Sequence, residues 1–275
     1  MVDNVLITGG TGTLGKAMTK RLLKDGCGRI CIYSRDELKQ AEMRTEFKDD
    51  PRLRFFIGDV RDLPRLRRAL EGIQLVIHTA ALKRVEVGEY DPGEMVKTNV
   101  LGAMNLIEAS HECGVKKVIA LSTDKAEEPV NAYGASKLLM EKLLLNANRS
   151  PYFSVVRCGN FFGSRGSVLP IWQKYIENGQ RVPLTNIKCT RFVMTVQQAV
   201  GIVKGLAKNN IPLLTPTLKA FRPVDLAKAL ETDYFICGLY RGERLHEIMN
   251  GQSSLDAERY TIKELKCLVQ ESLPD

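Results

Sequence analysis

Residues 5–15 read Val-Leu-Ile-Thr-Gly-Gly-Thr-Gly-Thr-Leu-Gly, a short apolar run that passes directly into a glycine-rich turn. Residues 16–24 follow with apolar side chains at helical spacing, so the stretch predicts a strand, a tight turn and a helix. In such a turn Gly9 permits the reversal, Gly12 lets the backbone approach a pyrophosphate, and Gly15 allows close helix–strand packing. The helix start then offers free N–H groups and the positive end of its dipole. The stretch therefore predicts a dinucleotide-binding site.

The same alternation of strand and helix continues along the first half of the chain. Short apolar runs recur at 29–33, 54–57, 75–78, 118–121 and 155–157, and helical patterns between them include 98–112 and 133–146. This order predicts an α/β fold, a doubly wound parallel sheet (Rossmann) with a smaller C-terminal substrate-binding lobe. We expect residues 1–165 to form the cofactor domain. Residues 166–275 are expected to form mainly the lobe, with segments returning to the sheet around 191–210.

The end of the second predicted strand indicates which nicotinamide cofactor is bound. An acidic residue there would bind the ribose hydroxyls of NAD, whereas a nearby arginine accommodates the 2′-phosphate of NADP. Here the strand runs into Ser34, Arg35 and Asp36, and Lys39 follows one turn later. Ser34 and Arg35 favour NADP. Asp36 comes slightly late for the acidic role and keeps NAD as the alternative.

Composition agrees with one compact enzyme. The chain has 275 residues, 44% of them hydrophobic, which is enough for a sizeable core. Its seven cysteines form no Cys-x-x-Cys pair and its three histidines are dispersed, so we expect reduced thiols and no metal site. The net charge of +8 favours anionic ligands, but its spread along the chain excludes nucleic acid as a partner. With no signal peptide and no membrane-length apolar run, a cytoplasmic protein is expected.

Residues 122–137 carry the chemistry: Ser-Thr-Asp-Lys-Ala-Glu-Glu-Pro-Val-Asn-Ala-Tyr-Gly-Ala-Ser-Lys. Tyr133 and Lys137 are four residues apart, so they share one face of a helix. An ammonium beside a phenol lowers the phenol pKa, and such a tyrosine can take a proton from a sugar hydroxyl while hydride leaves the same carbon. Asp124 and Lys125 add an acid and a base, which implies a second proton-transfer step.

Together these residues resemble the extended short-chain dehydrogenase/reductase superfamily. Within it, the chain is most similar to the inverting UDP-N-acetylglucosamine 4,6-dehydratases (5-epimerising), from its start to about Glu247. The similarity is carried by the segments 33–37, 56–62, 80–83, 121–126, 159–160, 163–168, 190–192 and 242–247. The combination of Ser-Thr-Asp-Lys-Ala at 122–126 with Gly-Ser-Arg-Gly-Ser-Val at 163–168 is far more specific than the glycine turn.

The resemblance implies a reaction. C4 is oxidised first, which makes the C5 proton acidic; C5 is then deprotonated and water is lost. Hydride then returns to C6 and a proton returns to C5 on the opposite face, which inverts C5. Tyr133 would take the C4 hydroxyl proton, assisted by Thr123 and Lys137. Lys125 would remove the C5 proton and Asp124 would protonate the departing hydroxyl, although the two could exchange roles. A lysine base must be neutral, so we expect burial and the Lys137 cation to lower the Lys125 pKa.

The resemblance also implies two binding sites and no metal ligands. The cofactor site would comprise Thr8, Gly9, Gly12, Thr13, Leu14, Gly15, Ser34, Arg35, Lys39, Asp59, Val60, Ala80, Ala81, Lys83, Asn99, Tyr133 and Lys137. The site for the UDP-sugar substrate would comprise Lys83, Asn160, Arg165, Ser167, Val168, Arg191, Glu243 and Arg244.

Some features depart from the family or leave alternatives open. Cys158 stands where a tyrosine is usual, Phe161-Phe162 is bulky, and the chain ends at Asp275, short of a typical member. The alternatives are a UDP-sugar 4-epimerase, a 5,6-dehydratase that stops at an unsaturated sugar, and, without turnover, an NADP-binding sensor or scaffold. Apolar residues on more than one face of 98–112 and 133–146 predict a homo-oligomer, a dimer or larger.

Overall fold

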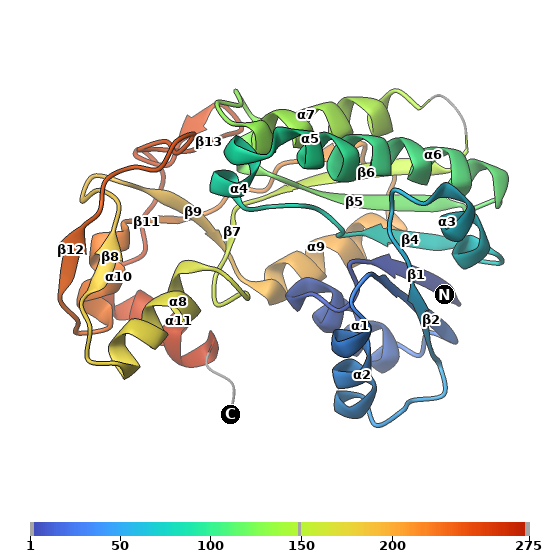
Figure 1. Ribbon diagram of the computed structural model, residues 1–275, viewed down its shortest axis with the longest axis horizontal. Helices are drawn as coiled ribbons and strands as arrows, with labels where there is room; N and C mark the ends of the chain where they lie inside the picture. The colour runs from blue at the N-terminus through green and yellow to red at the C-terminus, as the bar shows by residue number, and fades with distance from the viewer. Residues whose placement is uncertain (1–2, 148–149, 273–275) are drawn as a thin grey trace.

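A computed structural model describes residues 3–147 and 150–272. Its centre is a seven-stranded parallel sheet in the order β10-β6-β5-β4-β1-β2-β3 (Figure 1). The strands are β1 (Asn4–Thr8), β2 (Arg29–Ser34), β3 (Leu53–Ile57), β4 (Leu75–His78), β5 (Lys117–Thr123), β6 (Tyr152–Cys158) and β10 (Leu213–Leu214). The predicted doubly wound parallel sheet is confirmed. The sequence pattern missed only β10, which is too short to show a period of its own.

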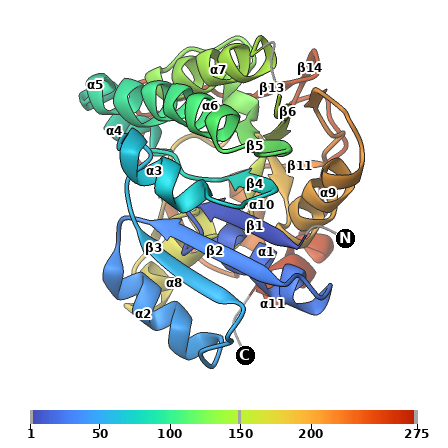
Figure 2. The ribbon, with the colours of Figure 1, turned by 90° about the vertical axis from the view of Figure 1, so that its right-hand side faces the viewer.

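Helices cover both faces of this sheet (Figure 2). One face carries α3 (Leu63–Leu70), α6 (Gly102–Glu112) and α7 (Ala132–Leu145). The other carries α1 (Thr13–Lys24), α2 (Glu37–Glu46) and α9 (Val196–Lys208). Because alternate residues of a strand point to opposite faces, Leu6 packs with the first set of helices and Ile7 with the second.

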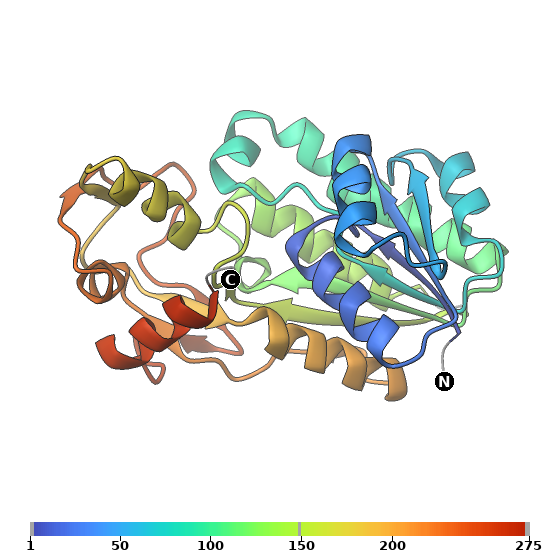
Figure 3. The same ribbon diagram turned by 90° about the horizontal axis from the view of Figure 1, so that it is seen from below.

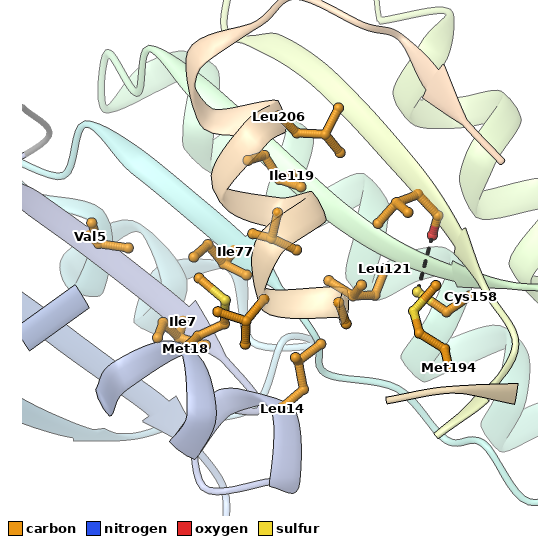
Figure 4. Packing of buried hydrophobic residues seen from close by; sticks show 14 of the residues in the cluster. Val5, Ile7, Leu14, Met18, Ile77, Ile119, Leu121, Cys158, Met194 and Leu206 are labelled. Carbon is orange, nitrogen blue, oxygen red and sulfur yellow. Dashed lines mark hydrogen bonds between the residues drawn. The ribbon is translucent and has the colours of Figure 1, made fainter. Parts of the chain in front are cut away.

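The helix α9 comes from the second half of the chain but lies beside α1 on the sheet (Figure 3). Val203 and Leu206 of α9 belong to one apolar cluster with Ile119 of β5 and Val156 of β6. Figure 4 shows Leu206 over Ile119, with Leu14 and Met18 of α1 close by. Lys204 on α9 also pairs with Asp25 at the end of α1, at 2.8 Å.

The C-terminal lobe has a core of its own. This core comes mainly from α8 (Val168–Glu177), β8 (Val182–Leu184), α10 (Pro223–Ala229) and α11 (Ile262–Ser272). The lobe also contains β12 (Tyr234–Ile236), which pairs with β8. A three-stranded sheet, β11 (Ala220–Phe221), β9 (Arg191–Met194) and β7 (Asn160–Phe161), lies between the lobe and the main sheet. A hairpin of β13 (Ile248–Met249) and β14 (Gln252–Ser253) follows.

The segment predicted as a helix over 98–112 is helical throughout, but its first part is π-helical. After α4 (Val85–Tyr90) and α5 (Pro92–Met95), a π-helical segment η1 (Val96–Leu101) leads into α6. Asn99 lies within η1, and its side chain bonds both the N–H and the C=O of Leu82, each at 2.9 Å. Such π-helical turns are rare and occur often at functional sites.

Two further findings concern the chain as a whole. All seven cysteines carry free thiols. Over residues 3–147 and 150–272, no helix combines the length and the apolar character that a bilayer crossing requires.

Candidate active site

A cleft of about 1100 Å³ lies at the carboxyl ends of the strands, between the sheet and the lobe. Most of the predicted site residues line it: Gly9, Gly12, Thr13, Leu14, Gly15, Ser34, Arg35, Lys39, Asp59, Val60, Ala80, Ala81, Lys83, Thr123, Lys125, Tyr133, Lys137, Asn160, Arg165, Ser167, Val168, Arg191 and Glu243. Strand ends are where ligands bind in sheets of this kind, so the two halves of the sequence signal meet in one crevice.

The glycine turn has the shape that a dinucleotide requires. Gly9 has a φ of +66°, and a Cβ there would lie 2.9 Å from the backbone nitrogen of Ala80. A Cβ on Gly15 would lie 2.4 Å from the carbonyl oxygen of Gly10, whereas one on Gly12 would meet only the Gly9 oxygen, at 3.2 Å. The outer side of Gly12 is therefore open to a ligand. Gly12 also starts α1 without a side-chain cap among the described residues, which leaves the N–H groups of the first turn for phosphate.

The end of β2 carries a basic cluster. Asp36 is the N-cap of α2: its side chain accepts a hydrogen bond from the backbone N–H of Lys39 at 3.0 Å and pairs with the Lys39 ammonium. Arg35 lies 3.6 Å from Asp59 and keeps a half-exposed side chain in the cleft. Asp36 thus caps α2 and pairs with Lys39, and Ser34, Arg35, Asp36 and Lys39 all line this end of the cleft.

The catalytic string begins where β5 ends. The short helix η2 (Asp124–Ala126) turns the chain there, and the Asp124 carboxylate accepts hydrogen bonds from the Thr123 hydroxyl at 2.8 Å and the Lys125 ammonium at 3.1 Å. A Cβ on Gly134 would lie 2.0 Å from the Lys125 carbonyl oxygen. Glycine at 134 therefore lets α7 press against η2 and brings Tyr133 close to the pair.

Burial shapes the titration of the α7 side chains. It raises the pKa of Tyr133 to about 12, against the charge of Lys125 and a hydrogen bond with Thr123. Burial likewise lowers the pKa of Lys137 to about 8, and its ammonium bonds the sulfur of Met140 at 3.0 Å. The expected fall of the Tyr133 pKa is wrong, because burial outweighs the nearby positive charge. The cation that lowers the pKa of the phenol is Lys125.

The expectation for Lys125 is also wrong in direction. Burial alone would lower its pKa, but the carboxylates of Asp124 and Glu247 outweigh burial and hold the pKa above its ordinary value. Burial raises the pKa of Asp124. The charged atoms of Asp124 and Lys125 are 3.1 Å apart, as in an ion pair, and a neutral lysine requires the ammonium to give up a proton.

Glu247 is the residue that the sequence interpretation missed. It is buried, lines the cleft, and places its carboxylate 3.2 Å from the Lys125 ammonium. The segment 242–247 carries part of the family resemblance, but the sequence assigns only Glu243 and Arg244 of it to the substrate site. A single sequence does not indicate which acid of such a segment faces inward.

Four predicted residues do not line the described cleft. Thr8 is fully buried and bonds His78 at 2.8 Å, so it joins β1 to β4. Asn99 is buried and ties Leu82 to Ser136 on α7. Arg244 donates to the backbone carbonyl of Glu128. These three residues lie outside the lining of the described cleft and hold neighbouring segments of the site together. The fourth, Asp124, is buried directly beside the lining residues Thr123 and Lys125.

The loop between β7 and α8 also reaches over the glycine turn. The backbone N–H of Arg165 donates to the Thr13 hydroxyl at 3.3 Å, and the Lys83 ammonium donates to the Arg165 carbonyl at 3.2 Å. On β9, Arg191 pairs with Glu243 at 2.5 Å, so its guanidinium is already partly occupied.

The parallel sheet with its glycine turn, and the Tyr133 and Lys137 side chains in the same cleft, define an extended short-chain dehydrogenase/reductase. The chain belongs to the family described as polysaccharide biosynthesis protein, whose model matches residues 5–266.

Named relatives are similar over much of the chain. The UDP-N-acetylglucosamine 4,6-dehydratase (inverting) of Campylobacter jejuni subsp. jejuni serotype O:2 is 47% identical over 257 residues, 90% of this chain and 77% of the relative. A UDP-glucose 4-epimerase of Rickettsia conorii is 45% identical over 212 residues, 74% of this chain and 62% of that protein. A solved dTDP-glucose 4,6-dehydratase of Streptomyces venezuelae, with NAD and TYD bound, has the same fold, with a TM-score of 0.83 at 21% identity, covering 97% of this chain and 96% of its own.

Proposed function

We propose that the chain is an NADP-dependent UDP-sugar 4,6-dehydratase, a hydro-lyase. Its reaction would convert UDP-N-acetylglucosamine to a UDP-2-acetamido-2,6-dideoxy-4-keto-hexose with inversion at C5. The observation that carries the proposal is the buried Asp124–Lys125 pair next to Tyr133 in the cleft. Oxidation of a hydroxyl group needs only the tyrosine, whereas loss of water needs an acid and a base as well. The similarity to the Campylobacter dehydratase supports the substrate.

The residues present fit a nicotinamide dinucleotide. Gly12 and the first turn of α1 would hold the pyrophosphate, and Ser34, Arg35 and Lys39 would bind a 2′-phosphate, which favours NADP over NAD. When bound, the nicotinamide supplies the hydride acceptor for C4 and the hydride donor for C6. All proton transfers remain with side chains of this chain.

Tyr133 acts on the C4 hydroxyl. Its phenolate form takes the proton, and the Thr123 hydrogen bond and the Lys125 charge are the groups that favour this form against burial. The ketone formed at C4 makes the C5 proton acidic, which prepares the second stage.

One internal proton transfer prepares Asp124 and Lys125 for that stage. Their charged atoms are 3.1 Å apart, so a proton can pass from the ammonium to the carboxylate and leave a neutral amine and a carboxylic acid. The amine then takes the C5 proton while the acid gives its proton to the departing C6 hydroxyl, which leaves as water. The pair thereby returns to an ammonium and a carboxylate, its starting form.

Substrate binding falls to the lobe side of the cleft. The Ser167 hydroxyl is buried at the start of α8 and has no partner among the described residues, so it is free to donate to a diphosphate oxygen. Asn160 accepts from the Lys125 ammonium at 3.3 Å, and this contact supports a role for its amide beside the reacting carbons. Arg165 and Lys83 would contribute positive charge to the diphosphate.

The test is to incubate the purified protein with UDP-N-acetylglucosamine in deuterated water and follow the sugar by proton NMR. We expect a 6-deoxy-4-keto product that carries deuterium at C5 with inverted configuration. Retained configuration would contradict the assignment of Lys125. Absence of a keto product while NADP binds would contradict the function itself.

The second candidate is a UDP-sugar 4-epimerase, which the similarity to the Rickettsia protein favours. That reaction uses only oxidation and reduction at C4. The same NMR experiment separates the two, because an epimerase keeps the C6 hydroxyl and introduces no deuterium at C5.

We also propose a homo-oligomer. Leu101, Met104 and Leu139 on η1, α6 and α7 each leave between 45% and 48% of their surface exposed, and covering them would remove apolar area from water. Light scattering coupled to size exclusion would measure the assembly, and a monomer would contradict the proposal.

A further inference from the structure

Glu247 lies at the centre of a buried group of charges that comes from distant parts of the chain. Its carboxylate is 3.2 Å from the Lys125 ammonium on η2 and 4.0 Å from the Arg191 guanidinium on β9. Only 3% of its surface is exposed. A charge this deeply buried is costly unless it is paired, so Glu247 and its two cations depend on one another.

The Lys125 ammonium donates hydrogen bonds to the Asp124 carboxylate at 3.1 Å and to the Asn160 amide oxygen at 3.3 Å. The Glu247 carboxylate forms an ion pair with the same ammonium at 3.2 Å. The position of the ammonium is therefore set by two hydrogen bonds and by the attraction of a second carboxylate. Glu247 is the member of this set that the proposed reaction does not yet use.

The backbone of Glu247 is itself fixed. Its N–H donates to the Ser254 hydroxyl at 2.9 Å, and the Ser254 N–H returns a bond to the Glu247 carbonyl at 2.8 Å. At the tip of the β13–β14 hairpin, the N–H groups of Asn250 and Gly251 each donate to the Glu127 carboxylate at 2.7 Å. Glu127 in turn accepts from Arg157 at 2.9 Å. The hairpin is thus tied to the segment that follows Lys125, and the Glu247 carboxylate has little freedom.

We propose that Glu247 is a positioning residue that aims the Lys125 side chain and keeps one shared proton on the Asp124–Lys125 pair. The proposal rests on the proposed dehydratase function, in which that single proton makes the amine and the acid available together. Without the Glu247 charge the pair would lose its proton more readily, and one of the two carboxylates that attract the Lys125 ammonium would be lost.

The expected pH dependence has a definite sign. Glu247 raises the pKa of both Asp124 and Lys125, so removing its charge lowers both. The other charged or titratable groups around the pair are Arg191 on β9, Tyr133 on α7 and Cys158 on β6, with Glu243 bound to Arg191. They are unchanged in a Glu247 variant. The form that holds one proton on the pair is the active one, so both limbs of the kcat–pH profile move to lower pH when the Glu247 charge is removed.

The test compares Glu247→Gln and Glu247→Asp with Glu258→Gln, a control that removes a carboxylate from the surface, 72% exposed. We expect Glu247→Gln to lower kcat by about 10- to 100-fold through misplacement of the base. Its kcat–pH profile should shift by about 1 pH unit or more toward acid. Glu247→Asp keeps the charge, so it should lose rate but leave the profile in place, and Glu258→Gln should match the wild type in both.

A second measurement isolates the affected step. With substrate deuterated at C5, Glu247→Gln should show a larger isotope effect on kcat than the wild type, whereas deuterium at C4 should show no increase. An unshifted pH profile with unchanged isotope effects in a folded Glu247→Gln protein would overturn the role of Glu247 alone. Failure of the wild type to form a keto sugar would instead overturn the proposed function.

Discussion

Replacing Gly134 by alanine tests whether the contact between α7 and η2 determines the geometry of the site. Gly134 is a helical glycine whose backbone N–H donates to the Asn131 side chain at 2.7 Å. An added Cβ would lie 2.0 Å from the Lys125 carbonyl oxygen. In real proteins a Cβ atom essentially never lies within 3.0 Å of such a neighbour. The backbones of α7 and η2 would therefore have to separate by at least about 1 Å.

Two opposing effects set the size of the change. Alanine is favoured over glycine inside a helix by up to about 1 kcal/mol. Overpacking a rigid contact costs about 1–3 kcal/mol, and here the obstacle is backbone, which cannot rotate away. We expect a net loss of about 1–2 kcal/mol. The larger effect is on catalysis, because a displacement of about 1 Å between catalytic groups can reduce the rate by about 100-fold.

The assay is paired with Gly201→Ala on α9, where an added Cβ meets nothing within 4 Å. Thermal unfolding and kcat for keto-sugar formation are measured for both variants. Gly201→Ala should gain stability and keep its rate, whereas Gly134→Ala should melt about 2–6 °C lower and lose most of its rate. A Gly134→Ala protein as stable and active as the wild type would refute the argument that this close approach sets the site.

Three further predictions follow from individual contacts. Arg35→Ala should weaken NADP binding by tenfold or more and leave NAD binding nearly unchanged, as measured by calorimetry; equal losses for both cofactors would contradict the 2′-phosphate assignment. Because the folded Lys137 pKa is about 8, the unfolded chain binds more protons between about pH 8 and pH 10. Over this range the unfolding free energy of the wild type, relative to that of Lys137→Met, should rise with pH by up to about 3 kcal/mol. If urea titrations show that this difference does not change with pH, the lowered pKa of Lys137 is contradicted. Glu127→Ala should unfold about 1–3 kcal/mol more easily, because Arg157 and the hairpin N–H groups lose their acceptor, and an unchanged denaturation midpoint would argue against that anchor.

The fold was largely predictable because its signals are local. The apolar run and glycine turn at 5–15 specify strand, turn and helix by period and backbone freedom, and each predicted strand of the main sheet is present. The π-helical turn at η1 was not predictable, since it accompanies the contact between Asn99 and Leu82, which only the folded chain brings together.

The site was predictable in its residue types but not in its electrostatics. The spacing of Tyr133 and Lys137 placed both in the cleft, yet burial raised the phenol pKa and lowered the lysine pKa. The charge of Lys125 depends on Glu247, which comes from a distant hairpin segment. Asp36 is a further example, because only the folded chain shows that its carboxylate caps α2 and pairs with Lys39.

The placement of α9 beside α1 bears on how the chain can be divided. Residues 1–165 contain the glycine turn and the catalytic string, yet one apolar face of β5 and β6 is covered by Val203 and Leu206 of α9. A fragment ending at residue 165 would leave Ile119, Leu121 and Val156 without this cover. α9 ends at Lys208, more than forty residues after residue 165. During synthesis this apolar face of β5 and β6 therefore stays exposed to water until those residues have been added. We therefore expect a fragment that ends at residue 165 to need α9, or another apolar cover for β5 and β6, in order to fold stably.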